Sequence, residues 1–481
     1  MRKVFMTGAT GVMGGAALDA LLAEDMRQEE LRIVVLARPS KRNARLLAPW
    51  QKRGVEVIWG DLLDKEAIAR GVADADIVLH IGGMVSPAAD WHPEQTLKVN
   101  VGAMANIIEA AKAREEAGAS VKVVYIGSVS QYGNRAQPFH WGRVGDPIRI
   151  ATWDRYALSK NLAEMLLAES GLKEWVSLRQ TGIMHSGLLS NASDPIAFHV
   201  PMRGCLEWVS AEDSGHLMAR VCRRELPASF WRNFYNIGGG ESWRRMNYDF
   251  VKATLSAVGC PKPEKVFDYN WFATGNFHGM WYEDSDDLDA LTGFRSGVTF
   301  KEYFAMLRQR LPFYFRLAPL APAALIKLGM KRVALKQGLG PLRWVRDNNA
   351  DRIRIAWGSR EAYDSLPDWK DADLREPSKM ALTLMHGYDE SKTIAELTAE
   401  ELQEAARFRG GRLLTAEYAT GDIYRPLEWE CADGHRFRLS AWSVLRGGHW
   451  CESCLRAQSD DPDALRNQAT RNPYLSQGLA Y

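Results

Sequence analysis

The chain has 481 residues, of which 46% are hydrophobic, enough for two or three domains with a sizeable core. Its 61 lysines and arginines nearly balance its 59 aspartates and glutamates, so the net charge of +2 does not indicate a protein that binds nucleic acid over its whole surface. Six cysteines in a chain of this length favour a reducing compartment.

The sequence predicts neither a leader peptide nor a membrane span. Met1-Arg2-Lys3 runs directly into a predicted strand and leaves no room for a signal peptide. The most lipophilic later stretch, Phe313–Met330, is interrupted by two prolines and by Arg316 and Lys327, so it cannot cross a bilayer as one apolar helix. We therefore expect a cytoplasmic protein with no transmembrane segment.

The first element is a predicted strand, Lys3–Met6, followed by a glycine-rich turn and a helix-forming run, Ala16–Leu22. The turn reads Thr7-Gly8-Ala9-Thr10-Gly11-Val12-Met13-Gly14. Glycines at this spacing let the backbone turn tightly, approach a pyrophosphate and pack the helix against the sheet. Free N–H groups at the start of the helix would then face the phosphates. The pattern indicates a dinucleotide-binding strand–turn–helix unit.

Further apolar runs alternate with helical patterns as far as Arg179. We predict five more strands, at Arg32–Leu36, Val55–Ile58, Ile77–His80, Val121–Ile126 and Val176–Leu178. Such alternation is typical of βαβ units in a parallel sheet, with a ligand crevice at the carboxyl ends of the strands. We therefore predict an α/β fold with a doubly wound, Rossmann-type parallel sheet.

A second motif, Tyr156-Ala157-Leu158-Ser159-Lys160, places Tyr156 and Lys160 four residues apart on one face of a predicted helix. A tyrosine and a lysine at this spacing are weak evidence when they stand alone. Together with the glycine turn, in this order and at this separation, they form a strong pattern.

The combined motifs resemble the extended short-chain dehydrogenase/reductase family, which includes nucleotide-sugar epimerases and dehydratases as well as hydroxysteroid dehydrogenases. The resemblance covers about residues 1–310. Its further landmarks are Gly60-Asp61-Leu62, His80-Ile81-Gly82-Gly83, Asn100 within Lys98–Val101, Tyr125–Gly133 and Arg179-Gln180-Thr181-Gly182. In the last of these, Gln180 replaces the family's usual proline.

The resemblance implies a set of site residues. Ser128, Tyr156 and Lys160 would be catalytic, with Ser128 holding the substrate oxygen and Tyr156 exchanging its proton. Lys160 and an oxidised nicotinamide are expected to lower the pKa of Tyr156. The residues implied for cofactor binding are Gly8, Thr10, Gly11, Val12, Met13, Gly14, Arg38, Asp61, Leu62, His80, Gly82, Asn100, Tyr156 and Lys160.

The choice of dinucleotide depends on the end of the second predicted strand. An acid there favours NAD, whereas an arginine accommodates the 2′-phosphate of NADP. The run Val35–Arg42 has no acid and offers Arg38, Lys41 and Arg42. We therefore predict NADP, with NAD as the alternative.

The substrate side is less well defined by the sequence. Gln137–Arg143 precedes the tyrosine motif and is expected to border the substrate. Aromatic residues in Asp268–Tyr282 suggest a wall for a flat apolar molecule, although such clusters are more often core. Arg203 and Arg232 would instead suit a nucleotide diphosphate.

The C-terminal part contains a second constellation. Cys431-Ala432-Asp433-Gly434-His435 is followed after 15 residues by Cys451-Glu452-Ser453-Cys454, and two such close pairs can surround Zn²⁺ tetrahedrally. Four protein ligands leave no open position, so we predict a structural site at Cys431, His435, Cys451 and Cys454. The pattern resembles a zinc-ribbon module, here beginning at Gly410-Gly411-Arg412-Leu413-Leu414.

The predicted organisation has four parts. Residues 1–311 form the dehydrogenase/reductase-like domain, with a Rossmann core over about 1–180 and an interleaved small substrate lobe mainly over 181–311. Residues 312–407 form a mostly helical connector that includes a helical run at Thr393–Ala406. Residues 408–458 form the zinc-ribbon-like module, and 459–481 a tail.

Three functions remain open from the sequence. The first is an NAD(P)-dependent oxidoreductase that interconverts a secondary alcohol and a ketone, with a steroid-like or polycyclic small-molecule substrate. The second is an epimerase or dehydratase of a nucleotide-linked sugar. The third is a dinucleotide-sensing regulator that uses the zinc module for contacts. We expect a homo-oligomer. The C-terminal module is the only part that suggests nucleic-acid binding, and its nearly balanced charges favour a structural or protein-contact role instead.

Overall fold

The computed structural model describes residues 2–23, 31–190, 194–223, 225–311 and 321–479. The start of the predicted connector, residues 312–320, and the last two residues of the predicted tail lie outside the described residues. The first half of the lipophilic stretch Phe313–Met330 falls there as well. Within the described ranges, no helix is both long and apolar enough to cross a membrane.

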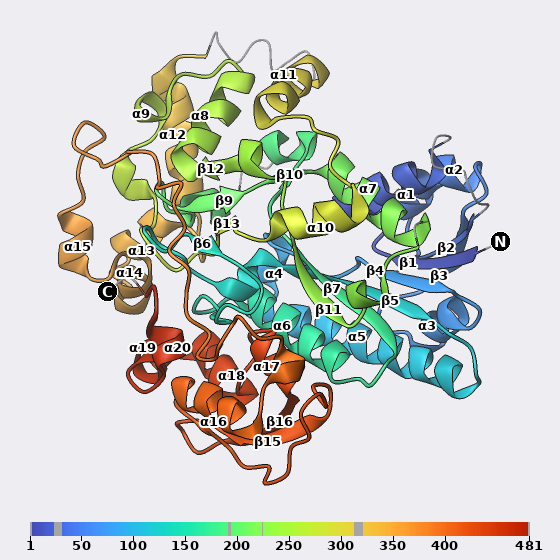
Figure 1. The fold of residues 1–481 in the computed structure, drawn as a ribbon. Coiled ribbons are helices and arrows are strands. Elements are labelled where there is room, and N and C mark those ends of the chain that lie inside the picture. The colour runs from blue at the N-terminus through green and yellow to red at the C-terminus, as the bar shows by residue number, and fades with distance from the viewer. Residues whose placement is uncertain (1, 24–30, 191–193, 224, 312–320, 480–481) are drawn as a thin grey trace.

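A seven-stranded, fully parallel sheet forms the centre of the molecule (Figure 1). Its order is β11-β7-β5-β4-β1-β2-β3. All six predicted strands are present, and the seventh, β11, joins next to β7. Their bounds are β1 Arg2–Thr7, β2 Leu31–Ala37, β3 Glu56–Trp59, β4 Ile77–His80, β5 Lys122–Ser128, β7 Glu174–Gln180 and β11 Asn233–Ile237.

The strand order reverses beside β1, because β2 follows on one side and β4 lies on the other. Open parallel sheets bind ligands at such a switch point, outside the carboxyl ends of the strands. The loops after β1 and β4 therefore meet at the place where a dinucleotide is expected. The predicted α/β fold class is confirmed.

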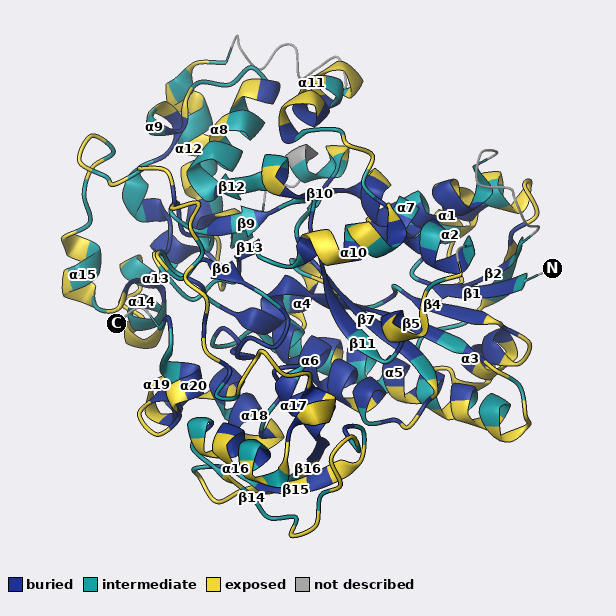
Figure 2. Ribbon diagram, viewed as in Figure 1, coloured by how far each residue is buried: buried dark blue, intermediate teal, exposed yellow. Residues whose placement is uncertain are grey.

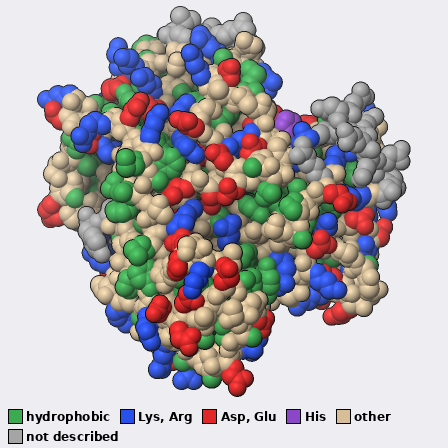
Figure 3. Space-filling model, viewed as in Figure 1, with side chains coloured by type: hydrophobic (Ala, Val, Ile, Leu, Met, Phe, Trp, Pro, Cys, Tyr) green, Lys and Arg blue, Asp and Glu red, His purple; other side chains and the backbone are tan. Residues whose placement is uncertain are grey.

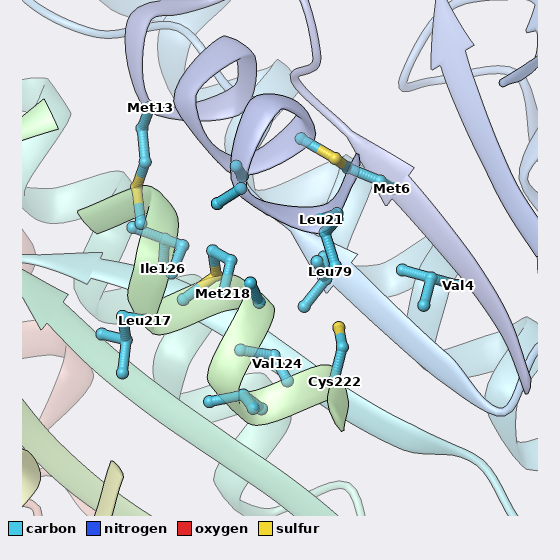
Figure 4. Packing of buried hydrophobic residues seen from close by; sticks show 14 of the residues in the cluster. Val4, Met6, Met13, Leu21, Leu79, Val124, Ile126, Leu217, Met218 and Cys222 are labelled. Atoms are coloured by element: carbon cyan, nitrogen blue, oxygen red, sulfur yellow. The ribbon is translucent and has the colours of Figure 1, made fainter. Parts of the chain in front are cut away.

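Helices cover both faces of the sheet, and the alternating side chains of β1 show how. Val4 and Met6 are buried against α1 (Val12–Leu22) and α7 (Ala211–Arg223), a packing that Figure 4 shows from close by. Phe5 points to the opposite face, towards α3 (Lys65–Val72) and α5 (Pro93–Glu116). Because both faces are covered, the strands are continuous apolar runs, as Figure 2 shows by the buried centre of the sheet.

A second lobe lies above the carboxyl edge of the sheet in the view of Figure 1. It contains three two-stranded sheets, β8–β10, β9–β12 and β6–β13, with helices α8 (Asn247–Ala257) and α11 (Phe300–Arg310). The strands are β6 Trp141–Gly142, β8 Ile183–Met184, β9 Cys205–Glu207, β10 Val209–Ser210, β12 Arg244–Met246 and β13 Trp281–Tyr282. Because β6 precedes β7 in the chain, the lobe is interleaved with the Rossmann core.

The connector is helical only in part. Its helices are α12 Ala323–Ala334, α13 Pro341–Arg346, α14 Ala350–Trp357 and α15 Arg360–Asp364. Residues 365–393, all of them described, form neither helix nor strand. The predicted helix Thr393–Ala406 is divided into a 3₁₀ turn, Ile394–Glu396, and α16, Ala399–Phe408. Thr398 and Glu401 form a capping box that begins the second helix, which explains the break.

We refer to residues 408–479 as the C-terminal module. It contains a three-stranded antiparallel sheet of β14 (Arg412–Leu413), β15 (Pro426–Glu430) and β16 (Arg436–Ser440). The helices of the module are α17 Ala441–Leu445, α18 Glu452–Asp460, α19 Ala464–Ala469 and α20 Pro473–Ser476. The predicted tail, residues 459–481, is therefore helical in part.

The C-terminal module is packed directly below α6 (Arg155–Ala168) in Figure 1. One buried apolar cluster contains Leu158 and Leu162 of α6 together with Trp429 and Leu439 of the module. The ribbon therefore completes a core that it shares with the helix of the tyrosine motif. On the face drawn in Figure 3, basic and acidic side chains are interspersed without a concentrated basic stripe.

Candidate functional site

A cleft of about 680 Å³ lies at the switch point of the sheet. Its wall is formed by the β1–α1 turn, the ends of β2, β3 and β5, the loop after β4, and the start of α6. The predicted site residues that line it are Gly8, Thr10, Gly11, Val12, Met13, Gly14, Arg38, Asp61, Leu62, Gly82, Ser128, Tyr156 and Lys160. The fold thus brings residues from six separate segments of the chain to one cavity.

The glycine turn has no room for larger residues at two positions. Gly8 has a φ of +82°, and a Cβ there would lie 2.6 Å from the backbone nitrogen of Gly82. A Cβ at Gly14 would lie 2.1 Å from the carbonyl oxygen of Gly8. Gly11 is the N-cap of α1, and no side chain of the described residues accepts a hydrogen bond from this helix end. The first N–H groups of α1 therefore face the cleft available for an anion, which fits a dinucleotide pyrophosphate.

His80 and Asn100 lie behind the cleft and are not among the described residues that line it. The Nδ1 of His80 is 2.8 Å from Thr7 Oγ1, which accepts a hydrogen bond from Gly82 N at 3.0 Å. Asn100 accepts from Met84 N at 2.8 Å and donates to Met84 O at 3.0 Å. Both residues thus fix the loop after β4 that lines the cleft, a supporting position that differs from the direct cofactor contact predicted for them.

Ser128 ends β5 and caps the short 3₁₀ turn Val129–Tyr132. Its backbone N–H donates to Gln131 Oε1 at 2.7 Å, and its Oγ accepts from Ser130 N at 3.2 Å. Two hydrogen bonds of this capping box hold the serine at the rim of the sheet. Its hydroxyl lines the cleft together with Tyr156 and Lys160.

Tyr156 and Lys160 occupy the first turns of α6, which Asp154 caps by accepting from Ala157 N at 2.8 Å. Lys160 is buried, and its Nζ donates to the carbonyl oxygen of Ile126 at 2.8 Å. The same Nζ lies 5.8 Å from the centre of the Tyr156 ring. The helix and β5 therefore fix the ammonium beside the phenol.

Burial dominates the protonation of both groups. It raises the pKa of Tyr156 to about 12, against a hydrogen bond with Ser128 that favours the phenolate. It lowers the pKa of Lys160 to about 8, opposed by the carboxylate of Glu164. The protein groups alone thus shift the pKa of Tyr156 upwards, whereas a lowered value was expected, because the loss of hydration outweighs the effect of nearby groups.

Arg38 follows β2 directly, and both Arg38 and Arg42 line the cleft with exposed side chains. Ser40 caps α2 (Lys41–Gln51) by accepting from Asn43 N at 3.0 Å. Asn43 also donates to the carbonyl oxygen of Arg38 at 2.8 Å. The turn that carries the two guanidinium groups is therefore fixed by hydrogen bonds.

The substrate side of the cleft differs from the predicted one. Of the predicted aromatic wall, only Phe277 and His278 line the cleft among the described residues, whereas Trp271, Phe272, Trp281 and Tyr282 are buried in the core. The segment Gln137–Arg143 also lies away from the cleft. It contacts the irregular part of the connector, for example through His140 and Trp141, which bond to the carbonyl oxygen of Ser378.

The two arginines considered for a nucleotide diphosphate are engaged elsewhere. Arg203 forms an ion pair with Asp373 and donates to Gln137 Oε1 at 2.8 Å. The guanidinium of Arg232 lies over the ring of Tyr424, 3.3 Å from its centre. Neither is among the described residues that line the cleft.

Several residues of the cleft wall are not among the predicted site residues. Those on the substrate side are Thr181, Gly182, Ile183, His185 and Ile196. Four of them immediately follow β7, so the rule that ligands bind beyond the carboxyl ends of strands would have selected this segment. Ile196 carries no such signal, because it belongs to a short 3₁₀ turn of the second lobe.

The four predicted metal ligands converge in the C-terminal module, where their ligand atoms all lie within 4.8 Å of one another. Cys431 Sγ is 3.6 Å from Cys454 Sγ, and His435 Nδ1 is 3.4 Å, 3.6 Å and 3.5 Å from the sulfurs of Cys431, Cys451 and Cys454. Zn–S bonds of about 2.3 Å and Zn–N bonds of about 2.0–2.1 Å give tetrahedral edges of roughly 3.4–3.8 Å. The donor set and its spacing fit a tetrahedral zinc ion.

Comparison with known proteins bears on the N-terminal part of the chain. Human 3 beta-hydroxysteroid dehydrogenase type 7 is 29% identical over 198 residues, which cover 38% of this chain and 50% of that protein. The inverting UDP-N-acetylglucosamine 4,6-dehydratase of Campylobacter jejuni is 26% identical over 110 residues, 23% of this chain and 32% of its own. The chain thus spans half or less of the length of these relatives.

Two solved structures share the fold. The dTDP-glucose 4,6-dehydratase of Bacillus anthracis in complex with NAD has a TM-score of 0.51 at 15% identity, and covers 64% of this chain and 96% of its own. That of Streptomyces venezuelae with NAD bound has a TM-score of 0.52 at 18% identity and the same coverage. At these identities the likeness shows the fold alone. The model of the NAD dependent epimerase/dehydratase family matches residues 4–179, so the N-terminal region of the chain is similar to that family.

Proposed function

We propose that the protein is a dinucleotide-dependent oxidoreductase that interconverts a secondary alcohol and a ketone. The observation that carries this proposal is the meeting of Ser128, Tyr156 and Lys160 in the same cleft as the glycine turn of α1. A protein that only sensed the dinucleotide would have no need for this trio, so the sensor is the weakest of the three alternatives.

The residues of the chain divide the chemistry among them. When bound, the dinucleotide exchanges a hydride with the substrate carbon. The Ser128 hydroxyl holds the substrate oxygen. The Tyr156 hydroxyl gives that oxygen a proton in reduction, and the Tyr156 phenolate removes one in oxidation. Burial raises the pKa of Tyr156 to about 12, so the phenol is protonated at neutral pH and can serve as the proton donor when a ketone is reduced. Lys160 provides a fixed positive charge beside the phenol.

NADP is the proposed dinucleotide. Arg38 and Arg42 line the cleft at the end of β2, where a 2′-phosphate would need cationic partners. The family is described as NAD dependent, so NAD is the alternative. Gly8, Thr10, Gly11, Val12, Met13, Gly14, Asp61, Leu62 and Gly82 would complete the binding site.

An apolar, ring-containing ketone is the proposed substrate class. Ile183, Ile196 and Phe277 give the substrate side apolar surface, and Arg203 and Arg232 are engaged outside the cleft. One relative acts on hydroxysteroids by its name. An epimerase or dehydratase of a nucleotide-linked sugar is the second candidate, because relatives with those names match the same region.

A single assay separates the two candidates. Purified protein is incubated with NADPH or NADP and a panel of ketosteroids, secondary alcohols and nucleotide sugars, with product analysis and dinucleotide absorbance followed together. We expect one dinucleotide to be consumed per ketone reduced. Tyr156→Phe should bind NADPH as wild type does but lower turnover by about 10²–10⁴-fold. A new sugar product without net change in dinucleotide would establish the epimerase instead.

We also propose one structural zinc ion at Cys431, His435, Cys451 and Cys454. Four protein ligands fill a tetrahedral shell, so the ion would stabilise the module and offer no position to a substrate. Elemental analysis should find one zinc per chain in wild type and a loss in Cys451→Ser. Metal-free wild type with a protease-resistant module would contradict the assignment.

A further inference from the structure

The C-terminal module contacts the catalytic helix α6 at its start and at its end. At the start, Trp153 N donates to Ser459 O at 3.0 Å, and Arg155 forms an ion pair with Asp460. At the end, Glu169 is the C-cap of α6, and it accepts hydrogen bonds from the backbone and side chain of Ser440 at 3.1 Å and 2.7 Å. The module therefore fixes both ends of the helix that carries Tyr156 and Lys160.

The middle of α6 is joined to the module by a fully buried carboxylate, Glu164, one turn beyond Lys160. His449 Nε2 lies 2.8 Å from Glu164 Oε1. The same carboxylate accepts from Arg179 Nη2 at 2.6 Å and from Gln131 Nε2 at 3.0 Å. Burial alone would raise the pKa of Glu164, but the guanidinium of Arg179 and the hydrogen bond with His449 together outweigh burial and hold the pKa below its usual range, so the group is a carboxylate.

The Glu164 carboxylate is hydrogen-bonded to Gln131, the residue that holds Ser128 in place. The Oε1 of Gln131 accepts from the backbone N–H of Ser128 at 2.7 Å, while its Nε2 donates to Glu164. A continuous path of hydrogen bonds thus runs from His449 through Glu164 and Gln131 to Ser128. Buried networks of this kind fix positions because each unsatisfied group would cost free energy.

The loop that carries His449 is packed closely against the rest of the chain through Gly447 and Gly448. Gly447 O accepts from Arg179 Nη2 at 2.7 Å. Gly448 has a φ of +74°, and a Cβ there would lie 2.3 Å from the carbonyl oxygen of Asp146. Two residues after His449 comes Cys451, one of the four proposed metal ligands. The metal site therefore holds the end of the loop that enters the catalytic domain.

We propose that the C-terminal module is a structural part of the active site, in which His449 is a positioning residue for Glu164, Gln131 and Ser128 and the metal cluster holds its loop. The contacts come from residues 440–460, far outside the region 4–179 that matches the family. The kinetic part of the test rests on the catalytic roles proposed above, so binding and hydrogen exchange are measured beside it.

The test compares His449→Ala, His449→Gln and a control, Arg438→Ala, which changes an exposed residue of β16 in the same module. We expect His449→Ala to speed amide exchange in α6 and in residues 128–132 by about tenfold or more, and to weaken NADPH binding and kcat while zinc content stays at one. His449→Gln, which keeps a donor, should recover part of each loss, and Arg438→Ala should match wild type.

Two results would overturn the proposal. The first would be that His449→Ala equals Arg438→Ala in amide exchange of α6 and in NADPH affinity. The module would then cover the catalytic domain without positioning its residues. The second concerns the metal. Cys451→Ser should lose zinc and speed amide exchange in α6 as well as in the module. Unchanged exchange in α6 of the zinc-free protein would refute the role of the metal cluster in holding the His449 loop. If His449→Ala does not fold, Glu169→Gln tests the same coupling from the other end of α6. A failure to find a ketone substrate would leave the exchange results standing.

Discussion

The proposed preference for NADP depends above all on Arg38. Its side chain is exposed at the rim of the cleft, and a 2′-phosphate there would receive a charge-assisted hydrogen bond worth about 1.5–3 kcal/mol. We expect wild type to bind NADPH more tightly than NADH, and Arg38→Asp to narrow or reverse the gap by roughly tenfold or more. Fluorescence titration with both dinucleotides checks this. Equal affinities in wild type would refute the assignment.

Burial of the Lys160 ammonium lowers the free energy of unfolding of the protein. Burial lowers the pKa of Lys160 from 10.5 to about 8, so folding is opposed at neutral pH by the cost of burying the ammonium. We expect Lys160→Met to be inactive yet more stable, by about 1–3 kcal/mol after the lost hydrogen bond to Ile126 is counted.

The pH dependence of that difference follows from linkage. Between pH 8 and 10.5 the unfolded chain keeps a proton on Lys160 that the folded protein has lost, so wild-type stability rises with pH relative to the variant. The gap between Lys160→Met and wild type should thus be largest below pH 8 and shrink above it. Urea unfolding at several pH values measures the gap, and a gap that widens from pH 8 upwards would contradict the burial argument.

At the scale of elements, the start of α1 contains two adjacent glycines, Gly14 and Gly15, that differ in their surroundings. A Cβ at Gly14 would meet the Gly8 carbonyl oxygen at 2.1 Å, whereas the nearest atom to a Cβ at Gly15 would belong to the Trp50 ring, at 3.4 Å. We expect Gly14→Ala to displace the turn and weaken dinucleotide binding at least tenfold. Gly15→Ala should bind normally and gain up to about 1 kcal/mol from helix propensity. Similar binding by the two variants would show that the close approach is not required.

The elements themselves were predicted with unequal success. Strands were found because buried parallel strands are continuous apolar runs, as in Ile77–His80, whose predicted and observed bounds agree. The helix predicted over Thr393–Ala406 was wrong in its continuity, because the capping box of Thr398 starts a new helix within it. For aromatic residues such as Trp271 and Trp281 the sequence left both a substrate wall and a core position open, and the structure buries them, since composition does not distinguish core from cavity.

At the scale of the whole molecule, the C-terminal module and the Rossmann domain share one buried core. A chain that ends at Leu311 would expose Leu158 and Leu162 of α6 and leave Glu164 without His449 and Glu169 without Ser440. We expect this shortened chain to be insoluble or to melt well below full-length protein, and not to bind NADPH. A soluble shortened chain with normal NADPH affinity in titration would contradict a shared core. Loss of the module should therefore remove the zinc site and also lower the stability and NADPH binding of the Rossmann domain.

The sequence by itself determined the local features of this protein. Glycine spacing at Gly8, Gly11 and Gly14, the Tyr156–Lys160 pair and the four metal ligands are short patterns whose chemistry requires those residue types, and the structure brings each group together. Tertiary structure alone decided that His80 and Asn100 support the cleft from behind, that the pKa of Tyr156 rises with burial, and that His449 reaches Glu164 across 285 positions of chain. Burial and long-range contacts depend on how distant segments pack, and no local pattern encodes that packing.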